Sequence, residues 1–224
     1  MSSAAIIGAG AFPRKAYPRE LIRRADRIVC CDGALAAYLR AREAIFGFPR
    51  DPDAVIGDMD SLSPALQERF RDVLVPVSEQ ETNDQTKAFH HILSQYPDVN
   101  EIHILGATGK REAHTLGNAS LLMEYARECG ACGVPEPGRI RLDMVSDWST
   151  LFAITGSCRL WVGQGRAVSL LTPDNALRIR SEGLEWPTDD VVFDNWWKAT
   201  LNRATRDEIR LEFSRPSVAL VILD

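Results

Sequence analysis

The sequence lacks any apolar run long enough to cross a bilayer, and it lacks an excess of basic residues. A transmembrane helix needs about 20 consecutive apolar residues, so we expect no membrane partner. Lys and Arg number 26 against 31 Asp and Glu, which gives a formal net charge of −5. Because nucleic-acid binding depends on clustered Lys and Arg, this balance argues against a nucleic-acid partner. A nucleotide substrate stays open, since local charge decides that.

Cysteines are few: there are five, an odd number, which fits a reducing compartment. Cys129 and Cys132 form a single CxxC, but no second pair and no nearby His completes a zinc site. The opening MSSAAIIGAGAF has neither the basic region nor the full apolar segment of a secretory signal. We therefore expect a cytoplasmic protein.

What the sequence does contain is an ordinary globular composition, with 45% hydrophobic and 25% charged residues. Over the first 130 residues, short β-branched runs alternate with helical patterns. The runs are AAIIG, RIVCC, AVIG, VLVPV and EIHIL, and the helical patterns lie at about 19–25, 33–42, 64–71, 84–96 and 114–128. This alternation predicts an α/β fold with a Rossmann-like parallel sheet.

The second part of the chain has a different pattern. A Gly- and Pro-rich stretch, ECGACGVPEPGR, is typical of a linker. After it come short apolar runs separated by turn residues, with little helical periodicity, which predicts a smaller all-β sandwich. We therefore predict two domains, an α/β domain at residues 1–133 and a β-sandwich domain at residues 139–224.

Polar clusters follow four of the predicted strands. They are Asp32-Gly33, the pair Asp58 and Asp60, the segment SEQETND and the segment GATGKREAH. Because parallel sheets bind ligands beyond the carboxyl ends of their strands, we expect these clusters to converge along one edge of the sheet.

The acidic residues Asp58, Asp60 and Asp84 are candidate ligands for Mg²⁺, which takes one or two carboxylates and completes its shell with water and phosphate oxygens. Other interpretations remain open. Asp58 and Asp60 also fit a solvated turn, and either Asn83 or Asp84 is a natural N-cap for the helix that follows.

The segment GATGKR has the components of a phosphate-binding loop. Gly106 and Gly109 allow close backbone approach, Thr108 offers a hydroxyl, Lys110 and Arg111 add positive charge, and a helix begins just beyond. A Gly-rich turn with solvated basic residues is the alternative. His114, which comes next, fits a capping or packing role as well as a phosphate contact. The earlier GAG at Gly8–Gly10 lacks the third glycine of a dinucleotide fingerprint.

All five tryptophans lie in the predicted second domain, at positions Trp148, Trp161, Trp186, Trp196 and Trp197. We expect most of them in the core or at an interface of the sandwich. One or two at a loop would be able to stack on a flat or cationic ligand. The best candidate is Trp186, which follows a predicted strand and precedes a Pro turn.

Taken together, these segments resemble the thiamine pyrophosphokinase family. CCDGA resembles its acidic DGG segment, VIGDMDSL its GDxDS metal motif, and EQETNDQTKA its DQD-x-TD region. GATGKREAHTLGN resembles the signature GATGGRxDHxxxN, and SEGLEW and TLN resemble the GLxW and SN segments near the C-terminus. Each motif alone is weak, but the ordered set over nearly the whole chain is specific.

The resemblance implies transfer of pyrophosphate from ATP to thiamine, giving thiamine diphosphate and AMP, with Mg²⁺ as cofactor and ATP as co-substrate. It also implies a homodimer, with thiamine held between the α/β domain of one subunit and the β domain of the other. The alternatives are a metal-dependent nucleotide phosphohydrolase, or a thiamine- or nucleotide-binding protein with weakened catalysis.

Site residues follow from the same resemblance. Asp58, Asp60 and Asp84 are implied to be catalytic and to hold Mg²⁺, and Arg111 is implied to clamp the phosphates. The implied ATP-binding residues are Asp32, Gly106, Thr108, Gly109, Lys110, Arg111 and His114, and the implied thiamine-binding residues are Gln80, Asn83, Trp186 and Asn202. Trp186 would stack on thiamine from across the dimer, and Asp84 is also a candidate acceptor for the thiamine proton.

Three positions depart from the family pattern. Ala113 stands where the family usually has Asp before the His, Leu201 where it has Ser before the Asn, and Asn83 where it has Thr. Glu112 is next to the missing carboxylate, but adjacent side chains on a helix or turn point in different directions, so we do not expect it to substitute. The departure at Ala113 predicts an impaired site.

Overall fold

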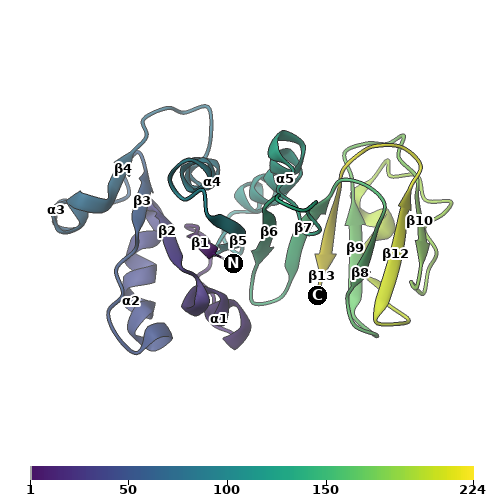
Figure 1. The fold of residues 1–224 in the computed structure, drawn as a ribbon, viewed down its shortest axis with the longest axis horizontal. Helices are drawn as coiled ribbons and strands as arrows, with labels where there is room; N and C mark the ends of the chain where they lie inside the picture. The colour runs from purple at the N-terminus through teal and green to yellow at the C-terminus, as the bar shows by residue number, and fades with distance from the viewer. Residues whose placement is uncertain (1) are drawn as a thin grey trace. The chain divides into compact units, whose positions relative to one another are not determined.

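A computed structural model describes residues 2–224, which form two compact units (Figure 1). The first unit runs to Asn118 and includes Met144–Asp147. The second comprises Ala119–Asp143 and Trp148–Asp224.

The first unit is built on a parallel sheet. Its five strands pair in the order β5-β1-β2-β3-β4, and every pairing is parallel. The strands are β1 (Ser2–Ile7), β2 (Arg27–Cys31), β3 (Ala54–Gly57), β4 (Leu74–Pro76) and β5 (Val99–Leu105). Most of their residues are buried, as expected for a parallel sheet. The predicted Rossmann-like α/β fold is confirmed.

The helices of this unit occupy the connections between the strands. They are α1 (Ala16–Arg24), α2 (Leu35–Phe46), α3 (Pro64–Phe70), α4 (Asp84–Gln95) and the start of α5 (Glu112–Cys129), whose residues from Ala119 on belong to the second unit, with single 3₁₀ turns at η1 (Asp32–Ala34) and η2 (Arg71–Val73). Local signals set their limits. The Ser63 side chain accepts from Leu66 N ahead of Pro64, and α2 ends at Gly47 with a φ of +79°.

The second unit contains two antiparallel sheets. One pairs in the order β11-β9-β13-β7 and the other in the order β10-β12-β8. The elements are β6 (Arg141–Val145), whose last two residues belong to the first unit, β7 (Thr150–Ile154), β8 (Cys158–Trp161), β9 (Ala167–Leu171), β10 (Ile179–Glu182), η3 (Trp196–Ala199), β11 (Asn202–Arg203), β12 (Glu208–Phe213) and β13 (Ala219–Leu223).

One aliphatic core joins these two sheets. Val168 of β9 and Val221 of β13 belong to the same buried cluster as Ile179 of β10 and Ile209 of β12. Two antiparallel sheets that share one core form a sandwich, so the predicted fold of the second domain is confirmed.

Two features of the second unit differ from the expectation. The five tryptophans do not lie in the core, one of the two places expected for them, since their exposed fractions run from 55% for Trp196 to 78% for Trp148. Their expected place at an interface stays a prediction. Alternation along β8 explains Trp161, which faces outward while its neighbour Leu160 faces the core. The predicted linker is tied to the sandwich, because Cys132 is buried and the N–H of Gly133 donates to the carbonyl of Ala153 in β7 at 2.9 Å.

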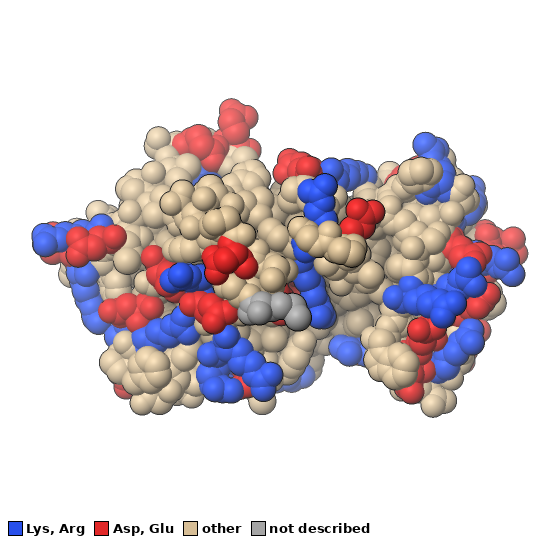
Figure 2. All heavy atoms as spheres, viewed as in Figure 1, with Lys and Arg blue, Asp and Glu red and all other residues tan. Residues whose placement is uncertain are grey.

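The outward face of the β10-β12-β8 sheet carries charges of both signs (Figure 2). Arg159 lies 3.6 Å from Glu208, and Arg210 lies 2.6 Å from Glu212. Such exposed pairs contribute little to stability individually, and the mixture of signs keeps this face solvated. Within residues 2–224, no helix has both the length and the apolar character needed to cross a membrane.

Candidate active site

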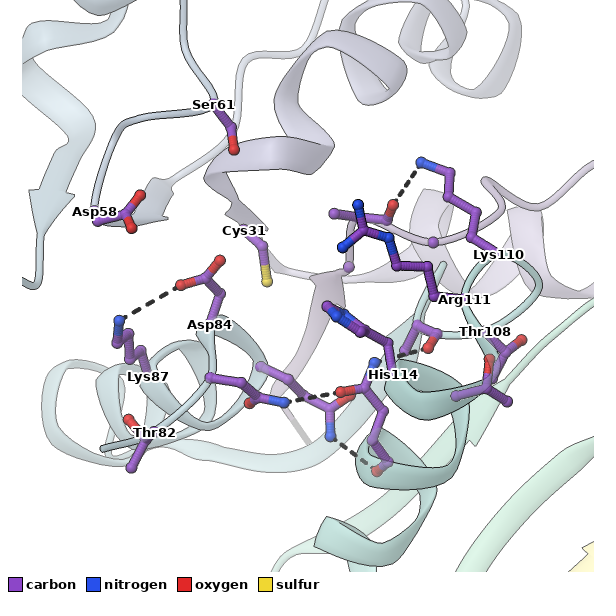
Figure 3. Close-up of a pocket in the computed structure, with 18 of the residues that line it drawn as sticks. Cys31, Asp58, Ser61, Thr82, Asp84, Lys87, Thr108, Lys110, Arg111 and His114 are labelled. Carbon is purple, nitrogen blue, oxygen red and sulfur yellow. Dashed lines mark hydrogen bonds and ion pairs between the residues drawn. The ribbon is translucent and has the colours of Figure 1, made fainter. Parts of the chain in front are cut away.

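A pocket of about 690 Å³ opens in the first unit, where the strands end (Figure 3). Its lining residues come from the last residue of β2 and from the segments that follow β1, β3, β4 and β5. Three of the four predicted polar clusters therefore meet at this edge of the sheet, and the fourth, Asp32-Gly33, lies behind the lining, where Asp32 accepts from Met59 N. The volume lies in the range of small-molecule sites, roughly 300–1,000 Å³.

Asp58 and Asp84 form one side of this pocket, which we call the acidic wall. Asp58 directly follows β3, in a turn whose backbone donates a hydrogen bond to Asp32. Asp32 is buried, and its Oδ2 accepts a hydrogen bond from Met59 N at 3.1 Å. A Cβ at Gly57 would lie 2.6 Å from Cγ of Asp32, so only glycine fits between the strand and this carboxylate. Met59 itself has a φ of +70°.

Asp84 reaches the pocket from the first turn of α4. Asn83 is the N-cap of this helix, because its side chain accepts from Thr86 N, and Asp84 therefore does not serve as the cap. The Nζ of Lys87, one turn further on, lies 3.6 Å from Oδ1 of Asp84 and donates to the carbonyl of Val77 at 3.2 Å.

Burial and mutual repulsion both disfavour the charged forms of the carboxylates in this region. Burial raises the pKa of Asp84, Lys87 counteracts it, and the negative charge of Asp58 raises it further. Burial also raises the pKa of Asp32, with Asp84 and Asp58 adding to the effect. The region thus holds more negative charge than its one buried cation balances, which is the electrostatic condition that favours a bound cation.

The donor set fits Mg²⁺ rather than an ion that needs an all-protein cage. Within residues 2–224 there is no group of three or more His, Cys, Asp or Glu placed to hold a metal ion. Asp58 and Asp84 face the same pocket, whose lining also includes the exposed Glu81. Mg²⁺ commonly uses one or two carboxylates together with water and phosphate oxygens. Asp60 is exposed outside the lining, and its N–H donates to Oδ1 of Asp58 at 3.1 Å.

Thr108, Lys110, Arg111 and His114 form the opposite side, which we call the basic wall (Figure 3). They lie in the loop after β5 and the first turn of α5. Positively charged side chains next to the start of a helix provide a site for an anion such as phosphate.

The GAG segment after β1 holds this loop in place. Gly8 N donates to the carbonyl of Leu105 at 2.8 Å, and Gly10 N donates to that of Gly106 at 2.6 Å. A Cβ at Gly10 would overlap the carbonyl oxygens of Gly106 and Thr108. The GAG segment therefore supports the phosphate-binding loop. Its failure to match a dinucleotide fingerprint in the sequence gave no sign of this role.

Eight of the predicted site residues line this one pocket: Gln80, Asn83, Asp58, Asp84, Thr108, Lys110, Arg111 and His114. Four others lie behind the lining or beside it: Asp32, Asp60, Gly106 and Gly109. The lining also includes residues for which we predicted no role, among them Gly8, Gly10, Cys31, Gln85, Lys87 and Asn118. The i, i+3 spacing of Asp84 and Lys87 was the one sequence signal that pointed to Lys87.

Trp186 and Asn202 line a second, smaller cavity of about 130 Å³ in the second unit. Asn202 Oδ1 accepts from Trp186 N at 3.1 Å, and its Nδ2 donates to the carbonyl of Trp186 at 2.6 Å. The buried amide of Asn202 thus holds the backbone at Trp186 while leaving the indole exposed. Leu201 departs from the family pattern and has a φ of +54°.

An acidic wall that faces a glycine-supported basic wall, at the strand ends of an α/β unit, is an arrangement typical of proteins that bind phosphorylated ligands. A family model described as the catalytic domain of thiamin pyrophosphokinase matches residues 18–132, and one described as its substrate-binding domain matches residues 150–216. The chain belongs to the thiamin pyrophosphokinase family, and the predicted resemblance is confirmed.

Individual relatives agree with this assignment. The chain is similar to thiamine pyrophosphokinase 1 of Oryza sativa subsp. japonica, at 28% identity over 111 residues, which is 46% of this chain and 38% of the rice protein. It thus spans well under half the length of that relative. Among solved structures, the thiamine pyrophosphokinase of Bacillus subtilis has a TM-score of 0.74 at 16% identity and covers 100% of this chain and 99% of its own. That of Candida albicans has a TM-score of 0.74 at 16% identity, covering 99% and 88%. At these identities the structural matches show the fold.

Proposed function

We propose that this protein is a thiamine pyrophosphokinase, which transfers the pyrophosphoryl group of ATP to thiamine. The observation that carries the proposal is the pairing of Asp58 and Asp84 with the loop from Thr108 to Arg111 across one pocket. Membership of the family supports the choice of thiamine as acceptor and ATP as donor.

The reaction forms one bond and breaks one. The hydroxyethyl oxygen of thiamine attacks the β-phosphorus of ATP, the bond from that phosphorus to the oxygen bridging the α- and β-phosphates breaks, and AMP leaves with that oxygen. The hydroxyl proton passes to a base, for which Asp84 on the acidic wall is the candidate. Such transfers need little covalent participation by the protein, because in-line positioning and neutralisation of charge supply most of the catalysis.

On the basic wall, Arg111 clamps the phosphates with its bidentate guanidinium, and Lys110 and His114 add donors to the same anion. Thr108 contributes a hydroxyl, while Gly106 and Gly109 let the backbone approach the phosphates. We also assign Asp32 to the ATP site, where its support of the turn at Asp58 sets the position of the acidic wall.

Mg²⁺ is the cofactor that this donor set fits. Asp58 and Asp84 would hold it, together with Asp60 from the same turn as Asp58. When bound, Mg²⁺ neutralises negative charge on the phosphate chain that develops during transfer.

For thiamine, we propose Gln80 and Asn83 in the first unit and Trp186 and Asn202 in the second. Trp186 has an exposed indole on a backbone held by Asn202, which suits stacking on a cationic heteroaromatic ring. In this proposal the protein is a cytoplasmic homodimer and each thiamine lies between two subunits. The functional domains are then residues 1–133 and 139–224, a division that the two matched segments support.

The test is to incubate the purified protein with ATP, Mg²⁺ and thiamine and to follow AMP and thiamine diphosphate by chromatography. We expect the two products in equal amounts, and none of either without thiamine.

Release of inorganic phosphate from ATP without a thiamine requirement would instead identify a phosphohydrolase. Calorimetric binding of ATP and thiamine with no AMP formed would identify a binding protein with weakened catalysis, for which Ala113 is the supporting departure. A control with Arg111→Ala shows whether any activity belongs to this pocket.

A further inference from the structure

Asn118, in helix α5, connects the acidic side of the pocket to the phosphate-binding loop through three hydrogen bonds. Its Nδ2 donates to the carbonyl of Ala107 at 2.8 Å, and its Oδ1 accepts from Nδ2 of Asn83 at 2.9 Å. Its own carbonyl accepts from Nε2 of Gln85 at 3.2 Å. Ala107 lies in the phosphate-binding loop, while Asn83 and Gln85 flank Asp84 at the start of α4. One residue therefore contacts both functional sides of the pocket.

The chemistry of the partners dictates how each amide is turned. Asn83 uses its Oδ1 to cap α4, accepting from Thr86 N at 3.0 Å, so its Nδ2 is the group left to face Asn118. The carbonyl of Ala107 only accepts, so Asn118 must present its Nδ2 there and its Oδ1 to Asn83. A carboxylate at position 118 would lack the donor, and an aliphatic side chain would lack both groups.

Gln85 depends on the same residue. Its Oε1 is buried and has no partner among the described residues, so its bond to Asn118 is the one contact that the structure gives its side-chain amide. Asn118 thus fixes two neighbours of Asp84 while also fixing the loop that carries Thr108 and Lys110.

We propose that Asn118 is a positioning residue that sets the spacing between Asp84 and the phosphate-binding loop, and so aligns the phosphate chain for transfer. This inference rests on the proposed function. Because misplacement by about 1 Å costs a reaction of this kind roughly 100-fold, a residue that sets this spacing affects turnover more than it affects ATP binding.

The test compares Asn118→Leu, which keeps approximate size and removes the polar contacts of the side chain, with the control Glu124→Gln at an exposed position of the same helix. Steady-state kinetics give kcat and KM, calorimetry gives the Kd for ATP with Mg²⁺, and circular dichroism gives the melting temperature. We expect kcat to fall at least tenfold in Asn118→Leu while the Kd changes less than threefold, with both constants unchanged in the control.

An unchanged kcat would overturn the inference. So would a rise in Kd with kcat preserved, because Asn118 would then be a direct ligand contact. If Asn118→Leu does not fold, the test uses Asn118→Ser, which is smaller and keeps one polar group. The same result is expected of it: a fall in kcat of at least tenfold and a change in Kd of less than threefold.

Failure of the proposed function would be recognised separately, as absence of thiamine diphosphate with the unaltered protein. Hydrogen exchange then decides the inference without turnover. We expect the amides of residues 84–88 and of residues 106–109 both to exchange faster in Asn118→Leu than in Glu124→Gln. Unchanged exchange in either segment would show that Asn118 does not couple them.

Discussion

The Nζ of Lys87 lies 3.6 Å from Oδ1 of Asp84, and only 5% of the Lys87 side chain is exposed. This ion pair places a buried cation at the acidic wall of the pocket, where Asp58 and Asp32 add further negative charge to the surroundings of Asp84. Lys87 also donates to the carbonyl of Val77, so its loss would leave both a carboxylate and a carbonyl without their partner.

We therefore expect Lys87→Met to destabilise the fold by about 1 kcal/mol, the low end of the cost of leaving polar groups unpaired, because Asp84 and Val77 are only partly buried. Urea unfolding measures the change, and Arg40→Met, at an exposed position of α2, is the matched control. Equal stability of the two variants would mean that the Lys87 pair makes no net contribution.

The carboxylates of the acidic wall should differ in their effects on turnover. We expect Asp58→Asn and Asp84→Asn each to lower kcat/KM at least 100-fold, because each removes a charge that faces the pocket. Asp60→Asn should cost less, about tenfold, since its side chain lies outside the lining and its N–H, which orients Asp58, is retained. The measurement is a magnesium titration of activity for each variant. Equal losses in all three would place Asp60 among the metal ligands on the same footing as the other two.

A methyl group at Gly10 should displace the phosphate-binding loop, because it would overlap the carbonyl oxygens of Gly106 and Thr108. We expect Gly10→Ala to raise the KM for ATP about tenfold or more, an effect equal to roughly 1.4 kcal/mol of binding. The control is Gly117→Ala in α5, where a Cβ meets nothing within 4 Å and alanine favours the helix. If Gly10→Ala binds ATP as the control does, the GAG segment does not support the loop.

Ala113 lies in the first turn of α5, between Arg111 and His114, which both line the pocket. We expect Ala113→Asp to raise the turnover rate, because it restores the carboxylate that the family usually has and places it near the positive end of the helix. Paired assays of the two proteins at saturating ATP, Mg²⁺ and thiamine measure the change. An unchanged or lower rate would show that the site is not impaired at this position.

Much of the fold was predictable because its signals are local. The alternation of β-branched runs with helical periodicity predicted the parallel sheet, and each predicted helix of the first unit is present with limits that differ by a few residues. Asn83 illustrates the cap signals, since it was one of two candidates and its side chain is the one that accepts from Thr86 N. The gathering of Asp58, Asp84 and Arg111 in one pocket was also predictable, because strand ends in a parallel sheet meet at one edge.

The sequence by itself therefore determined the classes of element, their order and the edge at which the polar clusters meet, since these depend on residues near one another in the chain. Only the tertiary structure decided which side chains support that edge. Lys110 donates to the carbonyl of Ala9 across 101 positions of sequence, and Asn118 bonds Asn83 across 35. The tryptophans of the second unit show the same limit, because the sequence left a core position and an interface position open, and strand register and loop position decided that they are exposed. Contacts of this kind depend on packing and register, which no short stretch of the chain encodes.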